Sequence, residues 1–187
     1  MTAPSLPPPI SRLSFRRATL ADVPAVRALV VSAFRGDASR AGWTTEADLF
    51  TDERISEAGL IKKIELRDSQ VIVALDAAGR LLGCGEVVGR GVVQIGMLAV
   101  APRSQGHGIG KALLAHLEQV ARAEHDAARV EMCVIWTRED VISFYARRGF
   151  VRTKRTKPFP WTELVNGKAL RDDLYFVVLE KSLGQMS

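Results

Sequence analysis

A glycine-rich turn, Gln105-Gly-His-Gly-Ile-Gly110, lies between two apolar patterns in this chain. Residues 92–100 read as a buried strand, and residues 109 to about 125 carry apolar side chains at helical spacing. The helical stripe consists of Ile109, Leu113, Leu114, Leu117, Val120 and Ala121. The first N–H groups of such a helix lack partners and its dipole is positive there, so a phosphate could accept several backbone hydrogen bonds at the turn. Gly106, Gly108 and Gly110 have no Cβ and would let the phosphate come close.

The spacing of the turn excludes two common nucleotide-binding motifs. A Walker loop has glycine at its first position and Ser or Thr after its lysine, but Gln105 and Ala112 stand at these places. A dinucleotide fingerprint that starts at Gly106 needs a glycine at position 111, where this chain has Lys111.

The remaining pattern, Gln105-x-x-Gly108-x-Gly110 after a strand that ends in Met-Leu-Ala-Val100, resembles the pyrophosphate loop of the GNAT superfamily of acyl-CoA-dependent N-acetyltransferases. Downstream, Ile142-Ser-Phe-Tyr145-Ala-Arg-Arg-Gly149-Phe is similar to the GNAT segment in which a short helix ends at a glycine and leads into a strand. Thr137 and Asp140 have capping-box spacing and predict the start of this helix, while Gly149 predicts its end.

The resemblance implies a mixed α/β fold, the GNAT fold, along residues 13–182. Its central mixed sheet is largely antiparallel, with about seven strands and about four flanking helices in the order βααβββαβαββ. The expected strands are residues 13–18, 71–75, 81–88, 92–100, 130–136, a strand from 150, and 174–179. The expected helices are residues 22–34, 52–66, 109–125 and the short helix before Gly149. Residues 1–11 are proline-rich and are expected to form a disordered tail, with residues 12–187 as a single acetyltransferase domain.

Composition is that of an ordinary globular protein, with 187 residues, 47% hydrophobic content and a net charge of +5. No stretch resembles a secretory signal or a membrane anchor, so we expect a cytoplasmic protein without a membrane partner.

Cys84 and Cys133 lie in expected strands without metal-ligand spacing, which predicts free thiols and no metal. The basic run Arg152–Lys157 could contact nucleic acid or assist coenzyme A phosphates, but no groove-reading motif accompanies it, and a solvated strand face is favoured. We expect no nucleic-acid partner and a monomer or homodimer.

The resemblance implies an acyltransferase that moves the acetyl group of acetyl-CoA to a primary amine by direct attack in a ternary complex. In the family, the cofactor arm lies between the strands that correspond to residues 92–100 and 130–136, where unpaired backbone groups can bind it. The cofactor-binding residues implied are Leu98, Ala99, Val100, Gln105, Gly106, His107, Gly108, Ile109, Gly110, Lys111, Arg138 and Tyr145. Plain core packing is the alternative for Leu98 and Val100. Arg138 stands near where many members carry an asparagine, and it could reach a phosphate, reach an acidic acceptor group, or be merely exposed.

Tyr145 matches the tyrosine that protonates the departing CoA thiolate in many family members. The alternative is a half-buried helix aromatic beside Phe144. The attacking amine must also lose a proton, because only its neutral form has a lone pair. Glu46, Glu86 and Glu131 are candidate bases, and a structural or solvated role stays open for each.

The acceptor site is expected where the Gly42–Asp48 loop and the Pro158–Trp161 segment interrupt regular structure. Its predicted substrate-binding residues are Trp43, Glu46, Phe159 and Trp161, with Glu46 holding the cationic amine of a small molecule or peptide or helping to deprotonate it. The aromatic residues could instead only pin the two loops to the domain.

The histidines suggest no catalytic triad, since no nucleophile motif accompanies them. His107 is expected to present its backbone to phosphate, and His116 and His125 are expected on the polar side of the long helix. A non-catalytic acyl-CoA sensor and a nucleic-acid-contacting module remain as alternatives. Tyr145 argues against the first and the missing reading element against the second.

Overall fold

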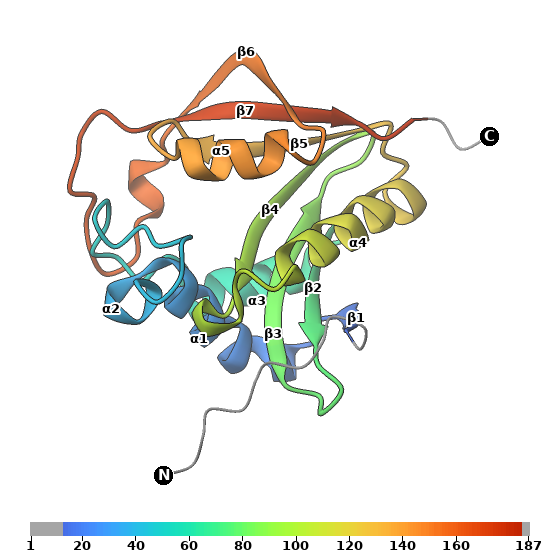
Figure 1. Ribbon diagram of the computed structural model, residues 1–187, viewed down its shortest axis with the longest axis horizontal. Coiled ribbons are helices and arrows are strands. Elements are labelled where there is room, and N and C mark those ends of the chain that lie inside the picture. Colours follow the sequence, from blue (N-terminus) through green and yellow to red (C-terminus); the bar gives the residue numbers. More distant parts are fainter. Residues whose placement is uncertain (1–12, 185–187) are drawn as a thin grey trace.

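The computed structural model of the protein describes residues 13–184, so the expected tail at residues 1–11 lies outside the described part (Figure 1). The strands are β1 (Ser14–Arg17), β2 (Ser69–Leu75), β3 (Leu81–Val88), β4 (Val92–Val100), β5 (Arg129–Ile135), β6 (Val151–Pro158) and β7 (Tyr175–Ser182). The α-helices are α1 (Val23–Phe34), α2 (Gly36–Ser39), α3 (Glu57–Glu65), α4 (Ile109–Glu124) and α5 (Glu139–Ala146). Short 3-10 turns are η2 (Leu20–Asp22), η3 (Pro102–Ser104) and η4 (Trp161–Glu163). No helix among these residues is long and apolar enough to cross a membrane.

The strands form one seven-stranded sheet in the order β1-β2-β3-β4-β5-β7-β6. Every neighbouring pair is antiparallel except β4 and β5, which are parallel. This confirms the expected mixed, largely antiparallel sheet. The basic run lies on β6, an edge strand that is exposed along most of its length. Arg155 of this run forms ion pairs with Glu131 and Glu180, at 2.8 and 2.9 Å, so part of its charge is neutralised within the sheet.

Helices cover both faces of the sheet, and strand alternation decides which side chains each helix contacts. Ile72 and Ala74 of β2 pack in the cluster that contains α4 and α5, whereas Val71 and Val73 pack in the cluster that contains α1 and α3. All six residues of the predicted α4 stripe are buried, which confirms the helical periodicity.

The two halves of the sheet separate beyond a short contact between β4 and β5. These strands pair only from Val92 to Gln94 against Arg129 to Glu131. β4 then runs toward α1 while β5 stays beside β7 (Figure 1). Backbone groups of both strands past this contact have no partner in the other strand, as the family resemblance implied.

Three local expectations were wrong. Helix α3 begins at Glu57 rather than near residue 52, because Arg54 adopts a left-handed backbone with φ 66° that a helix cannot include. The expected capping box is absent: α5 starts after Arg138, which has no capping side-chain bond, and the buried Thr137 hydroxyl lacks a partner among the described residues. His125 is buried rather than on a polar face, because its ring bonds the Gly89 carbonyl at 2.7 Å.

Candidate active site

A cavity of about 780 Å³ opens where β4 and β5 separate. Both strands line it, together with the glycine-rich turn, helix α5, and the segments around residues 34–54 and 159–164. The lining contains Gln105, Gly106, Gly108, Gly110 and Lys111 of the turn. A cavity of this size suits a cofactor and a small second substrate.

The glycine-rich turn presents the open N-terminus of α4 to the cavity. Gly108 is the N-cap in a left-handed conformation, with φ 80°, and no side chain caps the helix. The first bond of the helix runs from Ala112 N–H to Gly108 O at 3.0 Å, so the N–H groups of residues 109–111 are available to an anion. His107 is exposed, with its ring 3.3 Å from Ser104 O, and Ile109 is buried in the α4 stripe, so neither side chain lines the cavity.

Strand β4 reaches the cavity with a deformed backbone. Leu98 and Val100 line the cavity, whereas Ala99 points to the opposite core. The β3–β4 register shifts between Cys84 and Glu86, where β4 holds an additional residue, and Met97 has φ 48°. Such a bulge re-aims the backbone of a strand. The sequence carries no glycine at position 97 to signal this conformation, and Met97 was not predicted as a site residue.

Tyr145 projects from α5 into the cavity lining. Its ring packs against Phe144 and Phe150 at centroid distances of 5.2 and 5.6 Å, and its hydroxyl makes no hydrogen bond to a described residue. Burial raises the pKa of the Tyr145 phenol well above its ordinary value, while the charges of Arg148 and Arg138 oppose the shift. The phenol therefore keeps its proton across the neutral range.

Two distant segments close the open side of the separated strands. Phe50 and Ala169 form a β-bridge, and Thr51 N–H donates to Lys168 O at 2.9 Å. Phe159 stacks on Phe50 at 5.3 Å in this wall. Of the predicted acceptor residues, Trp43, Glu46 and Phe159 line the cavity, whereas Trp161 packs on Phe159 outside the lining.

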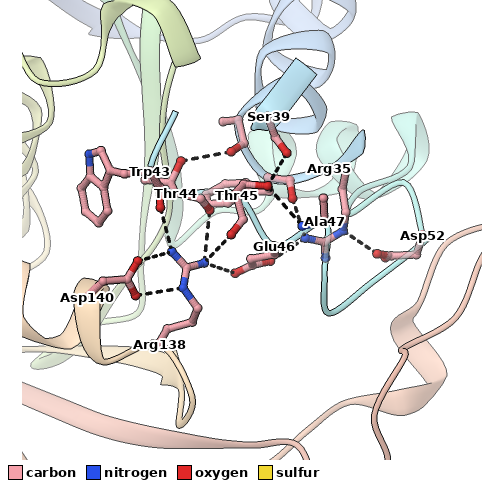
Figure 2. Close-up of polar contacts among 12 residues, drawn as sticks. Arg35, Ser39, Trp43, Thr44, Thr45, Glu46, Ala47, Asp52, Arg138 and Asp140 are labelled. Atoms are coloured by element: carbon pink, nitrogen blue, oxygen red, sulfur yellow. Dashed lines mark hydrogen bonds and ion pairs between the residues drawn. The ribbon is translucent and has the colours of Figure 1, made fainter. Parts of the chain in front are cut away.

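Arg138 links the 43–45 loop to helix α5 (Figure 2). Its Nη1 donates to the carbonyls of Thr44 and Thr45, at 3.2 and 3.0 Å, and its Nη2 donates to the carbonyl of Trp43 at 3.2 Å. Nε and Nη2 also donate to the carboxylate of Asp140, at 3.0 and 2.9 Å. These contacts use all five N–H donors of the guanidinium group within the protein.

Glu46 lies between two guanidinium groups. Its Oε2 accepts a hydrogen bond from Arg35 Nη1 at 2.5 Å, and its Oε1 is 3.9 Å from Arg138 Nη1. Arg35 is buried and also bonds Asp52 at 2.6 Å (Figure 2). The other two candidate bases do not line the cavity: Glu86 accepts bonds from Lys63 and Ser69, and Glu131 pairs with Arg155.

Gln105 connects the glycine-rich turn to the 43–45 loop through its side chain. Its Oε1 accepts from Trp43 N–H at 2.8 Å, and its Nε2 donates to Thr44 Oγ1 at 2.8 Å and Val100 O at 3.0 Å. A Cβ at Gly42 would lie 2.5 Å from this amide, so the close approach needs glycine. The sequence indicated a phosphate-binding turn but gave no sign of this second contact.

Cys133 also lines the cavity, and Cys84 is buried elsewhere; both are free thiols as predicted. Burial raises the pKa of the Cys133 thiol, although Lys157 opposes the shift. Because the thiolate is the reactive form of cysteine, this environment disfavours Cys133 as a nucleophile.

Similarity to known proteins agrees with the fold and shows the family of the chain. The family model described as an acetyltransferase (GNAT) domain matches residues 36–168. The amino-acid acetyltransferase of Mycobacterium tuberculosis (strain ATCC 25618 / H37Rv) is 31% identical over 144 residues, which cover 75% of this chain and 70% of that relative.

Two solved structures share the fold at low identity. The spermidine/spermine N-acetyltransferase SpeG from Vibrio cholerae superposes with a TM-score of 0.64 at 15% identity, covering 92% of this chain and 94% of that chain. The structure of yncA from Salmonella typhimurium with its cofactor acetyl-CoA gives 0.65 at 19% identity, covering 95% and 97%. The chain belongs to the GNAT acetyltransferase family and is an acyltransferase.

Proposed function

We propose that the protein transfers the acetyl group of acetyl-CoA to an amine bound in the same cavity. The observation that carries this proposal is the continuous cavity between the separated strands, which joins the open N-terminus of α4, the Tyr145 phenol and the wall formed by residues 43–54 and 159–164. One end offers backbone donors for phosphate, and the other end offers an enclosed surface for a second substrate.

The cofactor end has the charges that a polyanion requires. Lys111, Arg147 and Arg148 line the cavity there, and none of them forms an ion pair with a described carboxylate. We place the pyrophosphate at residues 105–111 and the cofactor arm along the backbone of residues 98–100. The exposed strand edge of β4 supports this placement, because amide groups of the arm can pair with it.

The chemistry follows from these positions. The neutral amine nitrogen attacks the thioester carbonyl carbon, the new C–N bond forms, and the C–S bond breaks as the thiolate leaves; the nitrogen gives up one proton, to Glu46 or to solvent, so that an amide is formed. Tyr145 donates its proton, or a hydrogen bond, to the departing sulfur. The high proton affinity of the buried phenol keeps the donor available, and the protonated Cys133 favours direct attack over an acetyl-cysteine intermediate.

Glu46 faces the acceptor end of the cavity, and we keep it as a residue that orients the acceptor amine or assists its deprotonation. Its ion pair with Arg35 favours the orienting role, since proton uptake by the carboxylate would weaken that pair. Glu46→Gln separates the roles: loss of amine binding raises the acceptor KM, whereas loss of a base lowers kcat and shifts its pH profile.

The sensor alternative is distinguished by thiol release, because a sensor would bind acetyl-CoA without turnover.

The central test is Gly108→Asp. The variant places a side chain and a negative charge at the left-handed N-cap, so the affinity for acetyl-CoA measured by calorimetry should fall at least about tenfold. Gly79→Asp is the matched control: Gly79 has a similar φ of 77° and lies outside the cavity lining. Equal affinities in the two folded variants would refute the assignment of the turn.

A further inference from the structure

The charged groups that line the cavity differ in whether they form an ion pair within the protein. Four carboxylates line it, and three bind arginine: Glu46 and Asp52 bind Arg35, and Asp140 binds Arg138. The fourth, Glu163, forms no ion pair within residues 13–184. Of the arginines at the acceptor end, Arg35 and Arg138 are used in these pairs, whereas Arg54 has no carboxylate partner in the described chain. At this end one carboxylate and one guanidinium therefore have no ion-pair partner among the described residues, while the three paired carboxylates exceed their two arginines by one negative charge.

Arg54 and Glu163 belong to two segments that contact each other directly. Glu53 N–H donates to Val165 O at 2.8 Å, so the residues next to Arg54 lie against the segment that follows Glu163. Gly167 packs so closely that a Cβ there would lie 2.4 Å from the Cα of Asp52. The two unpaired groups thus share one rim of the cavity.

The buried ion pair behind this rim fixes the position of Arg54. Asp52 bonds Arg35 through one carboxylate oxygen and accepts from the Arg54 backbone N–H at 3.1 Å through the other. Arg54 holds a left-handed backbone with φ 66°, which is uncommon for a residue other than glycine. Its guanidinium lies 5.5 Å from the centroid of the Phe34 ring at the cavity. The fold therefore presents, at the acceptor end, a guanidinium that has no ion-pair partner among the described residues.

We propose that the acceptor is an amino carboxylate, an amine that also carries a carboxylate group, and this inference rests on the function proposed above. Arg54 binds the acceptor carboxylate, because a guanidinium pairs with a carboxylate through two parallel hydrogen bonds. Glu163 holds the ammonium group of the acceptor before that group loses its proton, and Glu46 orients the neutral amine that results. A polyamine fits this rim poorly, since the unpaired guanidinium of Arg54 repels a polycation.

Acetyl transfer to three sets of probes tests the inference, with thiol release as the readout: free α-, β- and γ-amino acids, the corresponding amino-acid amides, and spermidine. We expect turnover of at least one amino acid, and at least about a tenfold higher KM for its amide. Arg54→Gln should raise the KM for the amino acid by a similar factor and leave the KM for the amide nearly unchanged, because the amide has already lost the carboxylate. Arg54→Lys should restore part of the loss, and Glu163→Gln should raise the KM for both.

Arg147→Gln is the matched control, since Arg147 lines the cofactor end and its loss should change the KM for acetyl-CoA alone. Preferred turnover of spermidine, equal use of amino acids and amides, or an Arg54→Gln variant with an unchanged acceptor KM would overturn the inference. A protein that binds acetyl-CoA but acetylates no amino acid also overturns it while leaving the proposed cofactor site in place. Failure to bind acetyl-CoA at all would instead refute the proposed function.

Discussion

Arg138 is the residue whose removal tests the organisation of the cavity most directly. In Arg138→Met the side chain keeps an apolar stem but loses five donors that bind three carbonyls of the 43–45 loop and the carboxylate of Asp140. Removing one partner from a buried charged network costs about 3–5 kcal/mol. The Arg138 side chain is 10% exposed, but that of Asp140 is 50% exposed and can be hydrated, so we expect a loss of about 3 kcal/mol in the free energy of unfolding.

This loss should leave the domain folded, because single domains are stable by about 5–15 kcal/mol. For a chain of this length it corresponds to a fall in Tm of about 6–12 °C. Urea unfolding gives the free energy, and hydrogen exchange should show faster exchange confined to the amides of residues 43–50. Arg152→Met is the control, because Arg152 and its partner Glu139 are both largely exposed, at 45% and 68%, and such surface pairs contribute little.

If the free energy of unfolding of the variant lies within about 0.5 kcal/mol of that of the unaltered protein, the five hydrogen bonds of Arg138 do not stabilise the 43–45 loop. The same variant examines the alternative role of Arg138 as a cofactor ligand. If acetyl-CoA affinity falls about tenfold while exchange in residues 43–50 is unchanged, Arg138 contacts the cofactor and the structural reasoning is wrong.

Two further predictions concern single side chains. Tyr145→Phe should lower kcat by about 10²-fold and leave the KM for acetyl-CoA nearly unchanged, because the ring packing against Phe144 and Phe150 is kept while the proton donor is lost; full kcat in steady-state assays would reduce Tyr145 to packing. His116 stacks on Phe15 at 4.5 Å, and burial lowers its pKa from the ordinary value of 6.5, with Glu124 opposing. The folded state thus favours the neutral ring, so its contribution to stability is present above about pH 6.5 and is lost as the pH falls below that value. His116→Gln should therefore lose less stability than the unaltered protein between about pH 7.5 and 5.5 in urea unfolding, and equal losses would contradict this assignment.

The sequence predicted the parts of the site that local pattern encodes. The strand before Gln105, the turn and the α4 stripe follow from glycine spacing and helical periodicity, and they lie as expected. Met97 could not be predicted, because its left-handed backbone depends on the register between β3 and β4 rather than on residue type. The loop contacts of Arg138 join residues 93 to 95 positions apart, and the one sign of a difference was an arginine near where the family usually has asparagine.

The charged groups of the proposed acceptor end could not be predicted either, because their contacts also join residues that are far apart in the chain. Whether a charged side chain can bind a ligand depends on which other side chains already neutralise it, and those partners come from segments far apart in the chain. Glu46 was the carboxylate that the sequence favoured, yet Arg35 and Arg138 lie against it, while Glu163 drew no attention and has no ion-pair partner among the described residues. Gln105 and Arg138 follow the two separated strands and both bond the 43–45 loop, so this loop is attached to the residues that flank the gap between β4 and β5. Under the proposed function, the choice of acceptor is therefore coupled to the backbone that we propose to bind the acetyl donor.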